Sequence, residues 1–202
     1  MTQGRYIVLE GSEGCGKSTH AARLAAALGA VVTRETGGTE IGRLIRTVLH
    51  DPSHTHLTGT AEALLIAADR AQHMAEVVRP ALTSGRHVVS DRSVYSSLAY
   101  QAYGRQLPYE TVRAVNDWAL GGRWPELVLF LDVPTDQLAA RMQRRELDRF
   151  ERESTAFHDR VLAGFREMAA KDPQRWVRID AARDHSEVAS AIRDAVRERL
   201  GL

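Results

Sequence analysis

The run Gly11-Ser12-Glu13-Gly14-Cys15-Gly16-Lys17-Ser18 carries the clearest chemistry in the chain. It fits the pattern G-x-x-x-x-G-K-[ST] without a mismatch, follows an apolar run and opens a helical stretch. Its glycines let successive backbone N–H groups point at phosphate oxygens, and the helix N-terminus adds positive potential. We expect Lys17 to reach the β- and γ-phosphates of ATP and the Ser18 hydroxyl to help hold Mg²⁺. The predicted ATP-binding set is Gly11, Ser12, Glu13, Gly14, Cys15, Gly16, Lys17, Ser18 and Thr19.

This phosphate-binding loop, or P-loop, does not by itself name a reaction. Switch GTPases, ATPases and small-molecule kinases all use one. A GTPase would also carry a base-reading Asn-Lys-x-Asp, which the sequence lacks. The pattern therefore favours a small-molecule kinase, with a nucleotide-binding regulatory module as an alternative of a different class.

An acceptor that is itself a phosphate needs arginines, because a guanidinium grips phosphate oxygens with two parallel donors. Asp-Arg pairs occur at residues 69–70, 91–92, 148–149 and 159–160, so only position separates them. Asp91-Arg92 directly follows an apolar run, where ligands bind in parallel sheets. We predict that Arg92 binds phosphate, and that Asp91 orients it or ligates Mg²⁺ through water. Asp69-Arg70 lies within a predicted helix, where a solvated ion pair is the plain alternative.

Five short apolar runs alternate with helical stretches, which predicts an α/β fold: a three-layer P-loop architecture with a five-stranded parallel sheet flanked by helices. The predicted strands are 6–9, 30–33, 87–90, 127–131 and 176–179. Predicted helices cover 17–28, 41–49, one long helix over 57–82, 94–102, 108–120, 135–142, a stretch ending near 170, and a last helix that an Asp184-x-x-Glu187 capping box begins.

Composition narrows the class of protein. The chain has 202 residues with 44% hydrophobic content and a formal net charge of +1, which argues against a polybasic nucleic-acid binder and against disorder. A single cysteine excludes an internal disulfide framework. No apolar run reaches membrane length and no signal peptide is visible, so we expect a cytoplasmic protein without nucleic-acid or membrane partners.

Several motifs in their order resemble the bacterial thymidylate kinase family, which belongs to the P-loop nucleoside monophosphate kinases. The family pattern Arg-Glu-Pro-Gly-Gly-Thr stands here as residues 34–39, with Thr36 in place of proline. Residues 67–73, 91–101 and 146–154 match the family's helix segment, the stretch after its Asp-Arg pair, and its lid. The resemblance runs from the P-loop to about Phe165. It implies one domain over 1–202 with a lid at about 143–154.

The resemblance also implies roles for single residues. Arg92, with Arg46, would hold the 5′-phosphate of thymidylate (dTMP), and Glu13 would accept a hydrogen bond from the sugar 3′-hydroxyl. Arg70 would meet a thymine carbonyl. The predicted thymidylate-binding set is Glu13, Arg46, Ile66, Arg70, Arg92, Ser97, Tyr100 and Gln101. Ser97 and Gln101 would contact the polar edge of the base, whereas Tyr100 would shape the pocket near the sugar or simply pack in the core.

A further arginine would support the phosphoryl group in transfer. Because Gly14 follows Glu13, the P-loop lacks it, and the lid would supply Arg144 and Arg149, as in the lid-arginine type of the family. The predicted catalytic set is Lys17, Arg92, Arg144 and Arg149, and the predicted metal ligands are Ser18 and Asp91. The acceptor phosphate has its second pKa near 6 and is mostly dianionic at neutral pH, so no general base is assigned.

Three positions depart from the family pattern and bear on base binding. Besides Thr36, Ser93 replaces a usual aromatic residue, and Ile66 stands where a phenylalanine often stacks on thymine. The predicted reaction is ATP plus thymidylate giving ADP and thymidine diphosphate, for dTTP synthesis. The alternative is another P-loop nucleotide or deoxynucleoside kinase with a different acceptor. A homodimer is expected from the resemblance, with the alanine-rich helix 57–82 as a candidate face.

Overall fold

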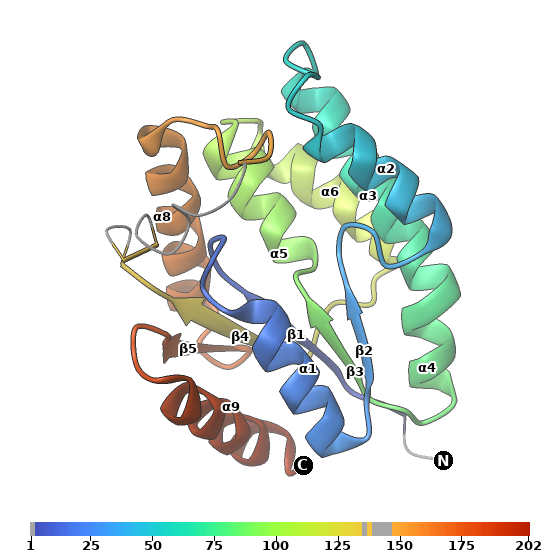
Figure 1. Ribbon diagram of the computed structural model, residues 1–202. Helices are drawn as coiled ribbons and strands as arrows, with labels where there is room; N and C mark the ends of the chain where they lie inside the picture. Colours follow the sequence, from blue (N-terminus) through green and yellow to red (C-terminus); the bar gives the residue numbers. More distant parts are fainter. Residues whose placement is uncertain (1–2, 135–136, 139–146) are drawn as a thin grey trace.

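The computed structural model describes residues 3–134, 137–138 and 147–202. It contains a five-stranded parallel sheet with the strand order β2-β3-β1-β4-β5 (Figure 1). The strands are β1 (Tyr6–Glu10), β2 (Val31–Arg34), β3 (Val88–Asp91), β4 (Leu127–Asp132) and β5 (Trp176–Asp180). All five predicted strands are therefore confirmed, together with the predicted fold class.

The helices of the described ranges alternate with these strands. They are α1 (Lys17–Leu28), α2 (Glu40–His50), α3 (Gly59–His73), η1 (Met74–Val78), α4 (Arg79–Thr83), α5 (Val94–Ser97), η2 (Leu98–Gly104), α6 (Tyr109–Leu120), α8 (Thr155–Lys171) and α9 (His185–Leu200). The long helix expected over 57–82 is present as α3, η1 and α4 in direct succession. Most of the expected helix 135–142 lies outside the described residues.

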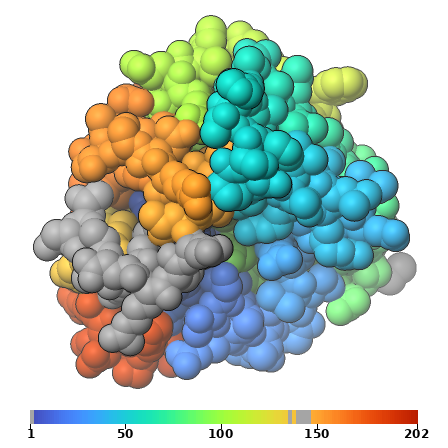
Figure 2. Space-filling view, turned by 45° about the horizontal axis from the view of Figure 1, so that its top comes forward, coloured from blue at the N-terminus to red at the C-terminus, as the bar shows by residue number. Residues whose placement is uncertain are grey.

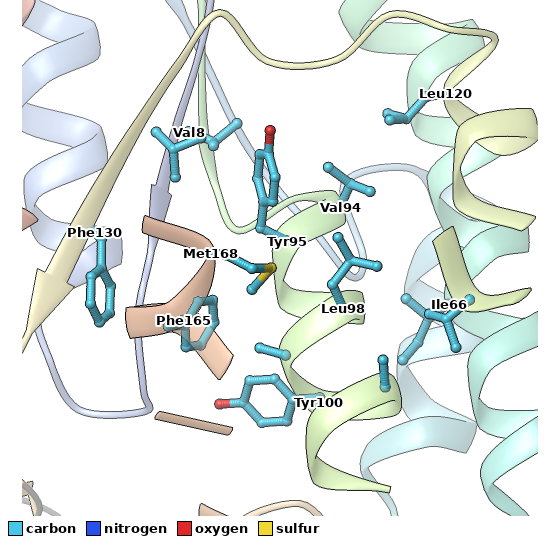
Figure 3. Packing of buried hydrophobic residues seen from close by; sticks show 14 of the residues in the cluster. Val8, Ile66, Val94, Tyr95, Leu98, Tyr100, Leu120, Phe130, Phe165 and Met168 are labelled. Carbon is cyan, nitrogen blue, oxygen red and sulfur yellow. The ribbon is translucent and has the colours of Figure 1, made fainter. Parts of the chain in front are cut away.

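Alternation along the central strand divides the core into two layers. Tyr6 and Val8 face a cluster formed with α3 to α6 and α8, whereas Ile7 and Leu9 face a second cluster formed with α1 and α9. A strand buried on both faces reads as a continuous apolar run, which is why the sequence revealed it. Figure 3 shows part of the first cluster, where Tyr95 and Phe165 pack between the sheet and the helices.

The register of the sheet brings the chemistry-bearing segments together. Leu9 of β1 pairs with Asp91 of β3, so the two strands end side by side. The P-loop follows β1 and Arg92 follows β3, so both start at the same edge of the sheet. The Arg92 N–H donates to the Leu9 carbonyl (2.9 Å), which ties the two exits to each other.

Candidate functional site

The P-loop wraps from β1 into α1 through backbone conformations that need glycine. Gly11 has φ 145°, and a Cβ there would lie 2.6 Å from the Leu131 carbonyl oxygen. Lys17 is the first residue of α1, and its Nζ donates to the Ser12 carbonyl (2.7 Å) across the loop. The loop therefore presents a lysine and the amino end of a helix to one space, as phosphate binding requires.

A cavity of about 430 Å³ opens beside this loop. It lies between the P-loop, the ends of β2 and β3, and the helices α2, α3 and α5–η2. All eight predicted thymidylate-binding residues line it: Glu13, Arg46, Ile66, Arg70, Arg92, Ser97, Tyr100 and Gln101. From the predicted ATP and metal sets, Gly14, Gly16, Lys17, Ser18, Thr19 and Asp91 line it as well.

Arg92 is held rigidly at the P-loop end of the cavity. Its Nη1 donates to the Gly11 carbonyl (2.9 Å) and to Ser96 Oγ (2.8 Å), while Nη2 donates to Glu13 Oε1 (2.6 Å) and Tyr100 Oη (3.2 Å). The backbone of Arg92 has φ 70°, an uncommon conformation for a residue with a side chain. The guanidinium is thus fixed by four acceptors around the place expected for an acceptor phosphate.

The charges of Arg92 and Glu13 each stabilise the ionised form of the other. Burial raises the pKa of the Glu13 carboxyl, but Arg92 and then Lys17 outweigh burial and hold that pKa well below its ordinary value. Burial likewise lowers the pKa of Arg92, and the Glu13 charge more than compensates, so Arg92 stays cationic. The pair is therefore ionised at neutral pH.

Glu10, the last residue of β1, lies fully buried beneath this pair. Its Oε1 accepts from the N–H groups of Ser93 (2.9 Å) and Ser96 (3.1 Å), and its Oε2 accepts from Ser96 Oγ (2.6 Å). Ser96 Oγ in turn accepts from Arg92, so Glu10 acts on Arg92 through one hydroxyl. Burial raises the pKa of Glu10 to about 7, although Arg92 and these hydrogen bonds oppose the rise.

Arg70 lies at the opposite end of the cavity, on α3. Its Nε and Nη2 pair with Glu35 Oε2 (2.9 and 2.8 Å), and its Nη1 donates to Ser97 Oγ (2.9 Å) and to Asn116 Oδ1. Glu35 also accepts from His73 Nδ1 (2.8 Å). Burial raises the pKa of Glu35, but Arg70 and His73 outweigh it and lower that pKa. Arg70 is thus a positioned cation within the cavity wall, and the solvated ion pair considered from the sequence is not what forms.

Gln101, on η2, is fully buried beside Arg70. Its Nε2 donates to Glu62 Oε1 (2.8 Å). Its Oε1 has no hydrogen-bond partner within the part of the chain that the structure describes. A buried amide oxygen without a partner is costly unless a ligand supplies a donor, so Gln101 offers an acceptor to whatever enters.

The predicted metal ligands are in contact. Ser18 Oγ, on the first turn of α1, donates to Asp91 Oδ2 at the end of β3. A hydroxyl and a carboxylate are the oxygen ligands that Mg²⁺ takes when it keeps several waters and binds phosphate oxygens. Among the described residues, no group of three or more His, Cys, Asp or Glu side chains could hold a metal ion.

Unlike Lys17 and Arg92, the two predicted lid arginines are not found at the cavity in the described structure. Arg144 lies outside the described residues, as do residues 143–146 of the predicted lid. Arg149 does not line the cavity: its Nη2 donates to Glu62 Oε2 (2.6 Å) and its Nε to the Leu49 carbonyl (2.7 Å). A role of Arg149 in phosphoryl transfer stays a prediction, and it requires the guanidinium to leave Glu62.

The described lid residues lie against α2 and the loop that follows it. Figure 2 shows this segment in orange directly against the cyan residues near position 50. His50 Nδ1 bonds Asp148 Oδ2 (2.7 Å), and the Arg149 N–H donates to the His50 carbonyl (3.2 Å). Phe150 thereby joins the cavity wall.

The other predicted positions belong to the frame of the site. Gly11 and Ser12 supply the carbonyls that orient Arg92 and Lys17, whereas Cys15 is buried in the second core cluster. Thr36 stands where the family has proline, and Arg46 Nη1 donates to both its carbonyl (3.2 Å) and its Oγ1 (3.4 Å). Proline has no hydroxyl and could not make the second contact. Ser93 Oγ bonds the buried Tyr6 hydroxyl (2.8 Å).

Sequence reasoning missed several residues of the site, namely Glu10, Arg34, Leu49, His50, Glu62 and Phe150. It also did not identify the inward face of α3. The alanine-rich face with Leu64 and Ala68 is exposed, and the buried residues are Glu62, Ile66, Ala67, Asp69, Arg70 and His73. Glu62, Ile66, Arg70 and His73 recur at steps of three or four residues. That spacing is the signal of a polar helix face turned inward.

Comparison with known proteins agrees with this geometry. The sequence model of one protein family, Thymidylate kinase, matches residues 9–192. The chain is 46% identical over 203 residues to a thymidylate kinase of Desulforudis audaxviator, covering 98% of this chain and 92% of that one. It is 46% identical over 202 residues to a thymidylate kinase of a Synechococcus species, covering 96% of both. A crystal structure of thymidylate kinase from Ehrlichia chaffeensis superposes with a TM-score of 0.80 at 26% identity, over 96% of this chain and 99% of that one.

Proposed function

The chain belongs to the thymidylate kinase family, and from that premise we propose that the cavity beside the P-loop is where thymidylate receives the γ-phosphate of ATP. The observation that carries this proposal is the polarity of the cavity. A fixed guanidinium, Arg92, lies at the P-loop end, while the other end presents the Arg70 cation and the Gln101 acceptor. Such a site fits an anion at one end and a base with a donor and a carbonyl at the other.

The thymine base would complete the hydrogen bonds of the far end. Its N3–H is a donor and would meet Gln101 Oε1, which has no partner among the described residues, while Arg70 would supply an N–H to a ring carbonyl. Cytosine presents an acceptor at N3, so it would leave the Gln101 oxygen unpaired. Ile66 supplies apolar surface beside the ring, and Ser97 is held next to the base edge by Arg70.

The acceptor phosphate would lie on Arg92, with Arg46 nearby. Arg92 already donates to Glu13, so the phosphate takes its place by exchanging with that carboxylate. Glu13, once released, can accept from the sugar 3′-hydroxyl. Tyr100 contacts the Arg92 guanidinium, with its ring centroid 5.2 Å away, and so packs where the sugar must lie.

The ATP phosphates would lie in the P-loop with Lys17 at the β- and γ-groups. Ser18 and Asp91 would hold Mg²⁺, which offsets the negative charge of the phosphates when it is bound. Because the acceptor phosphate is already a good nucleophile near neutral pH, the chain need not remove a proton. Its task is electrostatic: Lys17 and Arg92 reduce the repulsion between two anions brought into line. Arg144 and Arg149 stay our candidates for the lid arginine, and Arg149 would have to leave Glu62 to reach the phosphates.

We further propose a homodimer through α2 and α3. The α2 residues Ile41, Leu44 and Val48 are 49%, 64% and 40% exposed and share one face of that helix, and Leu64 on the packed α3 is 54% exposed. Exposed apolar side chains grouped in this way are typical of an interface. Light scattering of the unsubstituted protein and of Leu44→Glu tests this: a dimer that becomes a monomer supports it, and an unsubstituted monomer contradicts it.

The function is tested by ADP release with Mg-ATP against a panel of nucleoside monophosphates and free thymidine. We expect strong dependence on thymidylate, little on deoxycytidylate or thymidine, and loss of turnover when EDTA removes the metal. Turnover with another monophosphate would retain the phosphate site and contradict the base site. ATP binding without any acceptor dependence would contradict the kinase mechanism.

A further inference from the structure

Glu62 is a buried carboxylate that takes part in no contact proposed for substrate. It lies on the inward face of α3, is 0% exposed, and does not line the cavity among the described residues. Gln101 Nε2 donates to its Oε1 (2.8 Å), Arg149 Nη2 donates to its Oε2 (2.6 Å), and the Arg105 guanidinium reaches both oxygens at 3.0–3.3 Å. Every neighbour in this set is a donor.

This arrangement determines which end of the Gln101 amide faces the cavity. The oxygen and nitrogen of a glutamine side chain have nearly the same shape, so only the partners decide between two orientations related by a 180° flip. Arginine has no acceptor, so a carboxylate that receives two guanidinium groups is an acceptor only. Glu62 can therefore only accept a hydrogen bond from the Nε2 group of Gln101, and the Oε1 atom of Gln101 must point away from Glu62, toward the cavity.

The neighbouring charges keep Glu62 in this role. Arg105 also pairs with Glu153, whose Oε1 lies 2.5 Å from Arg105 Nη1, so the two arginines are matched by two carboxylates. Arg149 is anchored on the Leu49 carbonyl and cannot rotate away without losing that bond. The two carboxylates and two arginines thus form a neutral cluster, and Glu62 within it fixes the orientation of the Gln101 amide.

We propose that Glu62 is the positioning residue that sets base specificity: it holds the Gln101 amide so that an oxygen, not an amino group, faces the base. The inference rests on the proposed function, in which Gln101 reads the N3 position of the base. The enzyme then selects bases that carry an N–H at N3, as thymine and uracil do, through a carboxylate that never contacts them.

The variant Glu62→Gln tests this with almost no change of shape. The introduced amide must direct its oxygen to the arginines, so its amino group faces Gln101. Gln101 then flips to accept that bond and presents its own amino group to the base. We expect kcat/KM for thymidylate to fall about 10- to 100-fold, because two donors now oppose each other. The kcat/KM for deoxycytidylate, which has an acceptor at N3, should not fall. The ratio of kcat/KM for thymidylate to that for deoxycytidylate should therefore fall by a similar factor.

Glu153→Gln is the matched control. It removes the same charge from the same arginine cluster but does not contact Gln101 in the described structure. It should leave the thymidylate-to-deoxycytidylate ratio unchanged. A Glu62→Gln enzyme that folds but keeps the ratio, or a Glu153→Gln enzyme that lowers it as much, would overturn the proposal, because a merely structural defect weakens both substrates alike.

A second comparison separates this inference from the proposed function. Gln101→Leu alone should lower the ratio, and adding Glu62→Gln to it should lower the ratio no further, since the carboxylate acts only through Gln101. If Gln101→Leu leaves the ratio unchanged, base reading by Gln101 fails, and this inference with it. If Gln101→Leu lowers the ratio and Glu62→Gln does not, only the positioning role fails.

A measurement on the unsubstituted enzyme covers the case in which Glu62→Gln does not fold. In the NMR spectrum of the nucleotide-free protein, the side-chain NH₂ of Gln101 should exchange slowly with solvent, because it is buried on a carboxylate. Rapid exchange of that NH₂ group would overturn the proposal, whereas slow exchange supports it.

Discussion

Replacing the buried Glu10 by glutamine should change how the stability of the protein depends on pH. The pKa of this carboxyl is raised from an ordinary 4.5 to about 7, chiefly by burial. A group whose pKa is raised on folding binds its proton more tightly in the folded state. Its contribution is therefore fully present below pH 4.5 and is lost as the pH rises through about 7. A difference of this size corresponds to about 3 kcal/mol.

Glutamine has the shape of the protonated acid and does not titrate. Its oxygen can accept from the Ser93 and Ser96 N–H groups, and its amide can donate to Ser96 Oγ. We therefore expect the free energy of unfolding of Glu10→Gln to rise by about 3 kcal/mol relative to that of the unsubstituted protein between pH 4.5 and pH 8, so that the variant gains relative stability. Other carboxyls titrate alike in both proteins and cancel in the difference.

Urea denaturation at half-unit pH steps, followed by circular dichroism, measures this difference directly. Glu126→Gln, which changes a partly exposed carboxylate directly before β4 at the end of the sheet away from the P-loop, controls for the loss of one negative charge. Parallel stability curves for Glu10→Gln and the unsubstituted protein would refute the reasoning, because they would show that burial does not raise the pKa of Glu10.

Three further outcomes are expected. Arg92→Lys should weaken thymidylate binding about 100-fold, since a lysine cannot replace the charge-assisted hydrogen bonds of the guanidinium, each of which contributes about 1.5–3 kcal/mol; calorimetry should show thymidine binding unchanged, and an equal loss for thymidine would contradict the phosphate assignment. Ile66→Phe should tighten thymidylate binding about fivefold through stacking on the base, and no gain in calorimetry would place the ring elsewhere. Arg149→Met should lower the free energy of unfolding by about 3 kcal/mol, because it leaves Glu62 with one guanidinium; a thermal shift near zero would show that the Glu62 contact is not maintained in solution.

Much of the architecture was predictable because parallel strands are continuous apolar runs and the P-loop has a strict pattern. Val8 and Val128 are examples of residues whose burial follows directly from such runs. The inward face of α3 was not predictable from hydrophobic periodicity, because the cavity reverses the rule: it needs Glu62 and Arg70 inside and leaves Leu64 outside. The role of Arg70 on this helix was therefore expected only from the resemblance, whereas Lys17 and Arg92 followed from the P-loop pattern and from the position after a strand.

The partner of a polar group was harder to predict than its position. Arg149 was expected at the phosphates because the resemblance to the lid-arginine type of the family places a lid arginine there. In the structure it pairs with Glu62, a residue 87 positions away in the sequence. Glu10 was overlooked because it lies at the end of a strand, next to the P-loop, where only the fold shows that the Ser93 and Ser96 amides need an acceptor.

On the proposed binding mode, the Glu13–Arg92 ion pair would join the recognition of phosphate and of sugar into one event. In the nucleotide-free protein each group satisfies the other, at 2.6 Å. A free nucleoside brings no anion to displace the carboxylate, so its 3′-hydroxyl finds Glu13 already engaged. A nucleotide that lacks the 3′-hydroxyl displaces Glu13 but gives it nothing to accept. If these roles hold, the acceptor needs both the phosphate and the 3′-hydroxyl on one sugar, because neither group alone would satisfy both members of the ion pair.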